Sequence, residues 1–338
     1  MPKYTYPKKG IKGKKIIIIE YMELMHRPKN YSDDTPILKK MKLISIHYVG
    51  LYLRGLLSLF QVAVGKREFF KPGITATIIT KDDPWIFESI ESVKQYVDQI
   101  VIIDSSKNDF SKKIENFISS LEGIDVTFRH ENLSIFEARK LAQSLSEREW
   151  ILHWDGDMIA YTSGSRDFGG LVDCIYKLNK KKYYVIYFPL INIGVELDRL
   201  CKMKYQVEPW LYSNSNKIKW TDKTLNKSNN ERIEILKIPL YFKKIYLDTN
   251  YVLHLKHLMP REKFIVKMLH FKFMGIDEKV DYEKFYNENK NLKIPFYEDD
   301  TEPYDLSSKD ALPDVIKKYS GKTREQIFRE KGYDNSEL

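Results

Sequence analysis

A regular alternation of short apolar strands and amphipathic helices between residues 74 and 157 constrains the fold more than any other feature of this chain. Residues 74–80 are rich in β-branched side chains, which predicts a strand. Residues 100–103 are apolar throughout, as expected for a strand buried on both faces of a parallel sheet. Residues 126–128 and 150–154 predict two further strands.

The segments between these strands carry helix signals. Asp83 followed by Pro84 predicts an N-cap and a first helical position. Apolar residues recur at helical spacing over 86–97 and again over 110–121, and Ser134 with Glu137 forms the capping box of a third helix. Three βα units and a fourth strand predict a parallel, right-handed, doubly wound α/β sheet.

Acidic residues stand at the ends of three of the four predicted strands. They are Asp82, Asp83, Asp104, Asp155 and Asp157. In doubly wound sheets, ligands bind beyond the carboxyl ends of the strands, so we expect these side chains to line one site.

The triplet Asp155-Gly156-Asp157 places two carboxylates on one turn. Glycine permits close backbone approach, and two carboxylates beside a diphosphate suit Mg²⁺ or Mn²⁺. An acidic surface turn is the structural alternative, and the position of the triplet after a buried strand favours the functional interpretation.

Four motifs in this order resemble family 2 glycosyltransferases of the GT-A fold, a Rossmann-like, mostly parallel sheet flanked by helices. They are Thr80-Lys81-Asp82-Asp83, Asp104-Ser105-Ser106-Lys107-Asn108-Asp109, Asn132-Leu133-Ser134 with Ala138-Arg139-Lys140, and Asp155-Gly156-Asp157. Together they cover about a quarter of the chain. The resemblance implies a nucleotide-sugar donor held by the first half of the protein.

The resemblance also assigns roles to individual residues. Asp104 would contact the base or ribose, and the turn at Thr80, Asp82 and Asp83 would lie beside the same base. Arg139 would approach the diphosphate, to which a guanidinium fork is suited. The residues predicted to bind the donor are therefore Thr80, Asp82, Asp83, Asp104, Arg139 and Asp155.

The predicted metal ligands are Asp155 and Asp157 for Mn²⁺ or Mg²⁺. Many GT-A enzymes complete the metal site with a downstream histidine, and His254 is the candidate here. A histidine within a strand is otherwise a structural residue, and that alternative stays open. His153, inside the fourth predicted strand, is interpreted as a core histidine.

The catalytic base is the part of the site that the sequence defines least. Inverting members of the family use a carboxylate downstream of the metal motif to deprotonate the acceptor hydroxyl. Glu208 and Asp222 are the candidates, with Glu196 and Asp198 as weaker ones. Each also has an alternative as an exposed loop acid.

The second half of the chain is less regular. Residues 168–178 predict a helix, 183–188 a strand, and 191–220 an irregular, aromatic-rich segment. We expect residues 191–230 to form the acceptor side, with a mobile lid.

Strands are predicted at 236–246 and 251–258, a basic helix after Pro260, a loop-like tail over 287–304 and a surface helix over 316–328. The expected division is 1–73 as a basic extension, 74–160 as the nucleotide-sugar half, 161–285 as the acceptor half, and 286–338 as a C-terminal tail with a helix.

The net charge of +9 is concentrated at the N-terminus. Residues 1–73 carry 15 Lys and Arg against five Asp and Glu, so the rest of the chain is nearly neutral. The stretch 43–64 is long enough to span a bilayer, but its central Arg54 opposes a span. A helix packed on the protein, an interfacial membrane helix and a true span remain the three interpretations.

The strand-end acids and the family resemblance predict a metal-dependent glycosyltransferase of the hexosyltransferase type, with UDP preferred to GDP in the donor. The resemblance alone implies that the transfer is inverting. The acceptor would be a glycan, a lipid-linked molecule or a protein, and no nucleic acid partner is expected. We expect a cytoplasmic protein, with peripheral binding at an anionic inner membrane surface as an option. A sugar nucleotidyltransferase and a basic nucleic-acid-binding protein with an inert α/β domain are the alternatives. The segment after the first strand has no glycine, which opposes the former.

Overall fold

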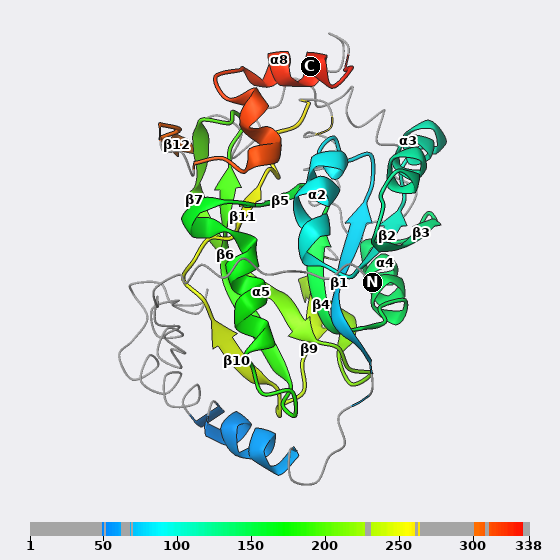
Figure 1. Cartoon of the computed structure of the whole chain (residues 1–338), viewed down its shortest axis with the longest axis vertical. Helices are drawn as coiled ribbons and strands as arrows, with labels where there is room; N and C mark the ends of the chain where they lie inside the picture. The colour runs from blue at the N-terminus through cyan, green and yellow to red at the C-terminus, as the bar shows by residue number, and fades with distance from the viewer. Residues whose placement is uncertain are drawn as a thin grey trace.

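The computed structural model describes residues 49–50, 52–61, 68, 70–226, 231–260, 263, 301–307 and 311–333. Within these residues, a ten-stranded sheet follows the order β3-β2-β1-β4-β7-β6-β11-β5, with β10 beside β6 and β12 beside β7. Helices flank this sheet, and β8 and β9 form a separate two-stranded sheet (Figure 1). The mixed α/β architecture, with its parallel first half, is consistent with the expected GT-A or Rossmann-like fold.

The parallel part of the sheet is the part predicted from the sequence. It consists of β1 (Lys71–Thr80), β2 (Gln99–Asp104), β3 (Asp125–His130) and β4 (Arg148–Asp155), which pair in parallel. The helices between them are α2 (Ile86–Val93), α3 (Asn108–Ser119) and α4 (Ile135–Ser144). The four predicted strands and three predicted helices of this half are therefore confirmed.

The helices divide between the two faces of the sheet. Apolar residues of α2, α3 and α5 (Phe168–Tyr176) share one core cluster with one face of β1 and β2. Ala138 and Ala142 of α4 pack against Val101 and Ile103 on the other face. Both faces of β1 and β2 are thus covered, which explains why residues 100–103 of β2 are apolar throughout and why Thr75 and Thr77 of β1 are buried.

Two details of the predicted helix starts have different outcomes. The capping box at Ser134 and Glu137 is confirmed, because each residue satisfies the backbone N–H of the other. The prediction of Asp83 as an N-cap is wrong: Trp85 occupies the cap position, and the Asp83 carboxylate accepts the Trp85 backbone N–H at 2.9 Å. Asp83 therefore stabilises the turn before the helix.

The segment predicted to be irregular, residues 191–220, is mostly strand, so that prediction is wrong. β6 (Tyr184–Ile193) and the 15-residue β7 (Arg199–Ser213) pair antiparallel, and β7 also pairs with β4. β8 (Lys219–Asn226) follows and pairs with β9 (Glu231–Lys237). Hydrogen bonding on both edges of β7 also opposes a mobile lid over this part of the chain.

The remaining strands are short. β5 (Met158–Ala160) pairs with β11 (Val252–His254), which is shorter than the predicted strand at 251–258. The predicted strand at 236–246 is instead divided between the end of β9 and β10 (Lys243–Tyr246). β12 (Thr301–Pro303) adds to β7 where a loop was predicted. The predicted helix after Pro260 lies outside the described residues, apart from Lys263.

The predicted surface helix over 316–328 is wrong in two respects. The segment forms a 3₁₀ helix, Asp314–Tyr319, and a separate helix α8 (Arg324–Glu330). Its apolar residues are buried in a cluster with Trp85, whose ring meets those of Tyr319 and Phe328 edge-on. This C-terminal segment therefore supports the turn that follows β1.

A buried ion pair joins the same two regions. Lys331 Nζ donates to both Glu88 carboxylate oxygens, at 2.6 and 2.7 Å, and to the Pro84 carbonyl. The Tyr319 hydroxyl also donates to Glu88, at 2.9 Å. Burial lowers the pKa of Lys331, while the Glu88 carboxylate opposes that shift.

Replacing Lys331 with methionine should lower the free energy of unfolding by about 2–4 kcal/mol, because Glu88 would stay buried without its main counter-charge. Urea unfolding at neutral pH measures the change. Lys322→Met is the matched control: it removes a more exposed pair with Glu330, for which we expect a loss of about 1 kcal/mol or less. Equal losses in the two variants would contradict this role of Lys331.

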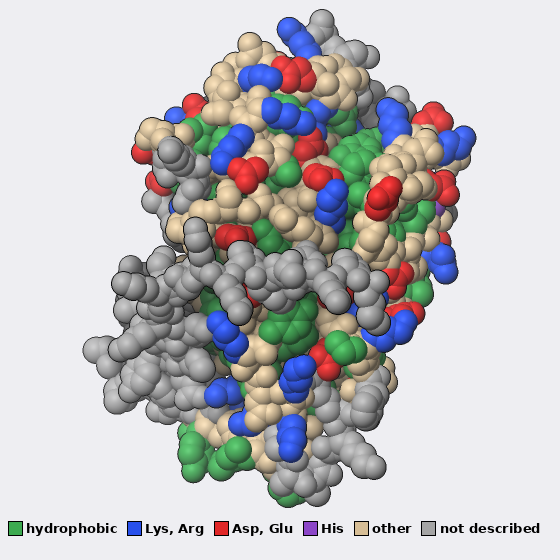
Figure 2. Space-filling model, in the orientation of Figure 1, with side chains coloured by type: hydrophobic (Ala, Val, Ile, Leu, Met, Phe, Trp, Pro, Cys, Tyr) green, Lys and Arg blue, Asp and Glu red, His purple; other side chains and the backbone are tan. Residues whose placement is uncertain are grey.

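Residues 49–50 and 52–61 are helical and lie at the end of the molecule where β1 begins, below β10 in Figure 1. Among the described residues, no helix has the length and apolar character needed to cross a bilayer. Apolar and basic side chains are visible at this end of the surface (Figure 2). We refer to residues 49–50 and 52–61 as the N-terminal helix.

Candidate functional site

The register of the parallel strands brings the predicted site residues to one edge of the sheet. Thr80, Asp104 and His130 are direct partners at the ends of β1, β2 and β3. Asp155, at the end of β4, is the partner of Ile79. The strand-end acids that are far apart in sequence therefore lie in one row.

The turns after β1 and β2 are joined by hydrogen bonds. The backbone N–H of Asp82 donates to the Ser106 hydroxyl at 2.6 Å, and the N–H of Lys107 donates to the Asp82 carboxylate at 3.0 Å. Asp82 has a φ of +50°, a left-handed conformation that aspartate tolerates better than most residues. Lys263 Nζ donates to the Asp82 carbonyl at 2.9 Å and fixes the turn from the other side.

Two buried oxygens on this edge have no hydrogen-bond partner among the described residues. Asp104 is fully buried, and only its Oδ1 accepts a bond, from the Ser106 N–H at 2.9 Å. Its Oδ2 and the Thr80 hydroxyl oxygen are the two unsatisfied atoms. A buried polar atom without a partner is costly, so both atoms are suited to a ligand that brings hydrogen-bond donors.

Gly156 lets the turn after β4 approach the turn after β1. A Cβ atom at this position would lie 3.2 Å from both the Thr80 hydroxyl oxygen and the Asp83 Cβ. Any larger residue would push the two turns apart, which is the physical reason for glycine between Asp155 and Asp157.

Asp155 forms an ion pair with Arg139 of α4, with 2.5 Å between Oδ1 and Nη2. His153 Nε2 lies 3.8 Å from the same oxygen. Burial favours the neutral carboxyl, but Arg139 and then His153 outweigh that effect and hold the pKa of Asp155 well below its usual range. Burial and the Arg139 charge lower the pKa of His153, so this histidine is neutral near pH 7.

Asp157 and His254 form a second contact, between adjacent strands. His254 Nε2 lies 3.2 Å from Asp157 Oδ1, and both side chains are buried. On its other side, His254 Nδ1 lies 2.8 Å from Asn192 Oδ1. If Nδ1 carries the proton that is donated to Asn192, Nε2 presents a lone pair beside a carboxylate, the arrangement of a histidine prepared to bind a cation.

The described residues contain no group of three or more His, Cys, Asp or Glu side chains that could hold a metal ion. Asp157 and His254 are thus a two-residue pair, with Asp155 drawn toward Arg139. A divalent cation held by one or two protein ligands needs substrate phosphates to complete its coordination, as is usual for Mg²⁺. The donor set fits a cation that binds together with a phosphorylated ligand.

The predicted bases have different outcomes. Glu208 lies on β7, three residues from Leu211, the last β7 residue that pairs with β4, and its charge opposes the lowering of the His153 pKa by burial and Arg139. The Asp222 backbone lies in β8, and its side chain is outside what the structure describes. The weaker candidates lie at the C-terminal segment: Glu196 accepts the Arg324 N–H at 2.7 Å, and the Asp198 carbonyl accepts the Tyr304 N–H.

Sequence reasoning missed the place of two residues, His130 and His153, in this site. His130 ends β3, and its Nε2 donates to the Ser106 carbonyl at 2.9 Å. His153, interpreted as a core residue, is buried but also lies beside Asp155, and its ring meets Trp210 and Trp220 edge-on. Trp220 also lies under the Arg139 guanidinium, 5.7 Å away. Only the position of His130 at a strand end was visible in the sequence.

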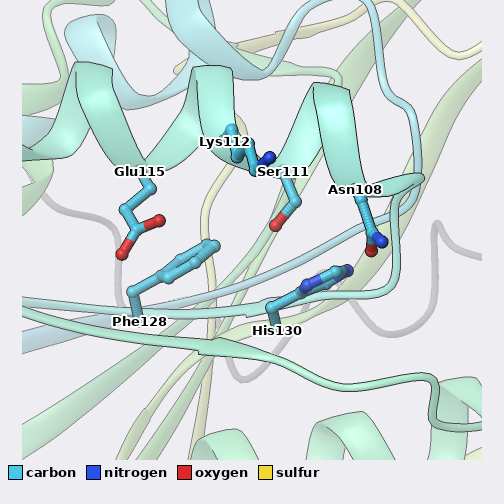
Figure 3. Close-up of a pocket in the computed structure, with 6 residues that line it drawn as sticks. All are labelled: Asn108, Ser111, Lys112, Glu115, Phe128 and His130. Carbon is cyan, nitrogen blue, oxygen red and sulfur yellow. The ribbon is translucent and has the colours of Figure 1, made fainter.

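A pocket of about 370 Å³ adjoins the loop after β2 on the outer edge of the sheet. Side chains from α3 point toward those from β3, and Asn108 and His130 lie at the same end (Figure 3). The other residues that line it are Ser111, Lys112, Glu115 and Phe128. The pocket reaches the edge of the site through His130, which lines it and also contacts the Ser106 carbonyl.

No protein-family profile and no curated protein sequence matches this chain. Among solved structures, S. aureus TarS matches with 12% identity over 67% of this chain and 44% of that chain, at a TM-score of 0.36. TarS 1–349 in complex with UDP matches with 13% identity over 65% and 72% of the two chains, at 0.34. The 4-diphosphocytidyl-2C-methyl-D-erythritol synthase from Anaerococcus prevotii matches with 10% identity over 53% and 90%, at 0.33.

This chain thus spans less than half the length of full TarS. TM-scores this far below 0.5 carry no functional conclusion. The functional assignment depends instead on the strand topology and on the contacts of the strand-end residues.

Proposed function

We propose that this protein is a glycosyltransferase of the hexosyltransferase type that uses a nucleotide diphosphate sugar. One observation carries the proposal. The strand register aligns Thr80, Asp104 and Asp155 at the carboxyl edge of the parallel sheet, and Asp157, two residues after Asp155, contacts His254. Such an edge is where doubly wound sheets bind nucleotides.

In this proposal, the first two turns hold the nucleoside. The unsatisfied oxygens of Asp104 and Thr80 accept hydrogen bonds from ribose hydroxyls or base N–H groups. Asp82 and Asp83 shape the turn beside the base. We propose UDP before GDP, and inversion of configuration, from the family resemblance of the motifs.

The diphosphate would lie near Arg139, Asp155 and Asp157. A divalent cation, Mn²⁺ or Mg²⁺, held by Asp157 and His254 with Asp155 assisting, would supply charge neutralisation on the leaving nucleoside diphosphate. Arg139 is buried beside Asp155 and contributes a fixed positive charge at the same place. The arrangement favours departure of an anionic leaving group.

Glu208 is our proposed general base, with Asp222 as the alternative. The acceptor hydroxyl oxygen bonds to the anomeric carbon, its proton moves to the carboxylate, and the bond from the sugar to the diphosphate oxygen breaks. Glu208 is preferred because its charge acts on His153, which lies 3.8 Å from Asp155. The acceptor itself, whether glycan, lipid-linked molecule or protein, is left to experiment.

A panel of UDP- and GDP-sugars with Mn²⁺ tests the proposal by thermal shift and donor hydrolysis. At a hundredfold excess over Kd, binding adds about 2.7 kcal/mol, which should raise the Tm by about 5 °C. Asp104→Asn should lose most of that shift because Oδ2 no longer accepts. The matched control, Asp109→Asn, changes an exposed carboxylate five residues away and should behave like the wild type.

The two alternative functions are tested beside this panel, with a nucleoside triphosphate plus a sugar 1-phosphate and with nucleic acid. Pyrophosphate release from a nucleoside triphosphate and a sugar 1-phosphate would assign the protein to the nucleotidyltransferases. Salt-sensitive binding of nucleic acid without any nucleotide-sugar response would favour the nucleic-acid alternative. Either result would overturn the proposed glycosyl transfer.

A further inference from the structure

The N-terminal helix presents its apolar side to solvent and its polar side to the protein. Seven large apolar side chains are between 38% and 70% exposed: Val49, Tyr52, Leu53, Leu56, Leu57, Leu59 and Phe60. Most of them recur at the helical spacing of three and four residues, so they form one stripe. A surface helix of a soluble protein normally has the opposite arrangement.

The inward side of this helix carries polar residues at the same spacing. Arg54 donates to the Pro239 carbonyl at 3.3 Å, and Ser58 is almost fully buried. The helix is therefore held by its polar side, and the apolar stripe is left for a partner. Leu240, next to Pro239, is 58% exposed and adds to the apolar surface.

The end of the molecule on which the N-terminal helix packs is strongly basic. Three segments meet there in one apolar cluster that includes Tyr183, Ile218 and Phe242. These segments, 174–188, 213–221 and 235–247, contain nine lysines, and Asp173, Asp222, Glu234 and Asp248 lie directly outside their ends. Glu68, which accepts the Asn216 N–H at 2.8 Å, is a further acid at this end, so the lysines remain in excess. The lysines are Lys177, Lys180, Lys181, Lys182, Lys217, Lys219, Lys237, Lys243 and Lys244.

We propose that this end of the protein docks on an anionic lipid bilayer. An exposed apolar stripe with basic residues around it is the pattern of a helix that lies in the headgroup region. The charge of the three segments is complementary to an anionic surface, which a second copy of the same basic end would not be. The proposal does not depend on the proposed transferase activity.

Docking in this way sets the orientation of the candidate site. β1 begins at this end, with Lys71, and finishes at the site, with Thr80. A ten-residue strand is about 33 Å long, so the site would face away from the bilayer at roughly that height. An acceptor attached to the same membrane would then have to extend from the surface to be reached.

Co-sedimentation of the full chain with vesicles tests the proposal. We expect binding to vesicles of phosphatidylcholine with phosphatidylglycerol, and at least about tenfold weaker binding to phosphatidylcholine alone or in high salt. The double variant Leu53→Glu, Phe60→Glu should lose binding to both kinds of vesicle, with and without phosphatidylglycerol. Its melting curve should match the wild type, because both side chains are exposed.

A charge-matched pair of variants separates local docking from overall charge. Lys180→Glu, Lys181→Glu should weaken binding at least about tenfold, since each lysine near an anionic surface contributes about fivefold. Lys112→Glu, Lys113→Glu changes the net charge equally on α3 and should have much less effect. Equal binding by the two pairs would overturn the proposal. So would a wild-type dimer that Leu53→Glu, Phe60→Glu converts to a monomer, because a second copy would then occupy the stripe.

Discussion

Replacing Asp157 with asparagine should lower donor turnover at least about a hundredfold while the protein stays folded. The carboxylate is buried and lies 3.2 Å from His254 Nε2, and the amide has nearly the same size. In metal sites, the loss of even an outer-shell partner typically costs 10- to 100-fold, so the loss of a carboxylate that is proposed to bind the cation itself should cost more. Initial rates of nucleotide-sugar hydrolysis over a range of Mn²⁺ concentrations measure this effect.

The metal dependence distinguishes a binding role from a structural one. His254→Gln should raise the Mn²⁺ concentration needed for half-maximal rate, and Asp157→Asn should not recover at any concentration. Asp109→Asn, which removes an exposed carboxylate, is the matched control and should keep the wild-type rate. Full turnover by Asp157→Asn would remove the triplet from the proposed mechanism.

Replacing Arg139 with methionine should lower both stability and turnover. Asp155 would remain mostly buried without its counter-charge, and we expect the free energy of unfolding to fall by about 2–4 kcal/mol, since the carboxylate is 28% exposed. Adding Asp155→Asn to this variant should restore much of the stability but not the turnover. Recovery of both would show that Arg139 only balances Asp155 and has no role toward the donor.

The pH dependence of the same variant has a definite sign. Arg139 holds the pKa of Asp155 below its unfolded value, so the pair stabilises the protein above about pH 4 and loses this contribution as the pH falls further. Without Arg139, burial would raise that pKa instead. The stability difference between wild type and Arg139→Met should therefore shrink between pH 7 and pH 3. Urea unfolding at these two values measures it, with Arg139→Lys as the charge-retaining control.

The first half of the fold could be predicted because its signals are local. β1 and β2 are short runs rich in β-branched and apolar residues, and the Ser134–Glu137 capping box is a contact between neighbours in sequence. Once the strands are known to be parallel, the alignment of Thr80 and Asp104 follows from topology. The alignment of these strand-end residues on one edge was therefore predictable from the sequence.

The second half depends on long-range contacts, which a single sequence does not reveal. β7 contains Pro209 and lacks a clear alternation, yet it is stabilised by pairing with both β4 and β6. His153 has the sequence signature of a core residue, and only the fold brings its ring against Trp210 and Trp220, which are 57 and 67 residues away in sequence. The orientation of the N-terminal helix is likewise not visible in the sequence, because it is set by a contact with the distant residue Pro239.

The contact between Glu88 and Lys331 has a consequence for how the protein folds during synthesis. The two residues are 243 positions apart, and the loop that they close contains most of the sheet. At about 5–20 residues per second, a ribosome adds Lys331 roughly 10–50 s after Glu88. During that interval, the turn after β1 lacks the buried partners of Trp85 and Glu88. A nascent chain should therefore acquire the final geometry of the turn after β1 late, and a factor that shields exposed apolar surface would act on the parallel half of the sheet before α8 is made.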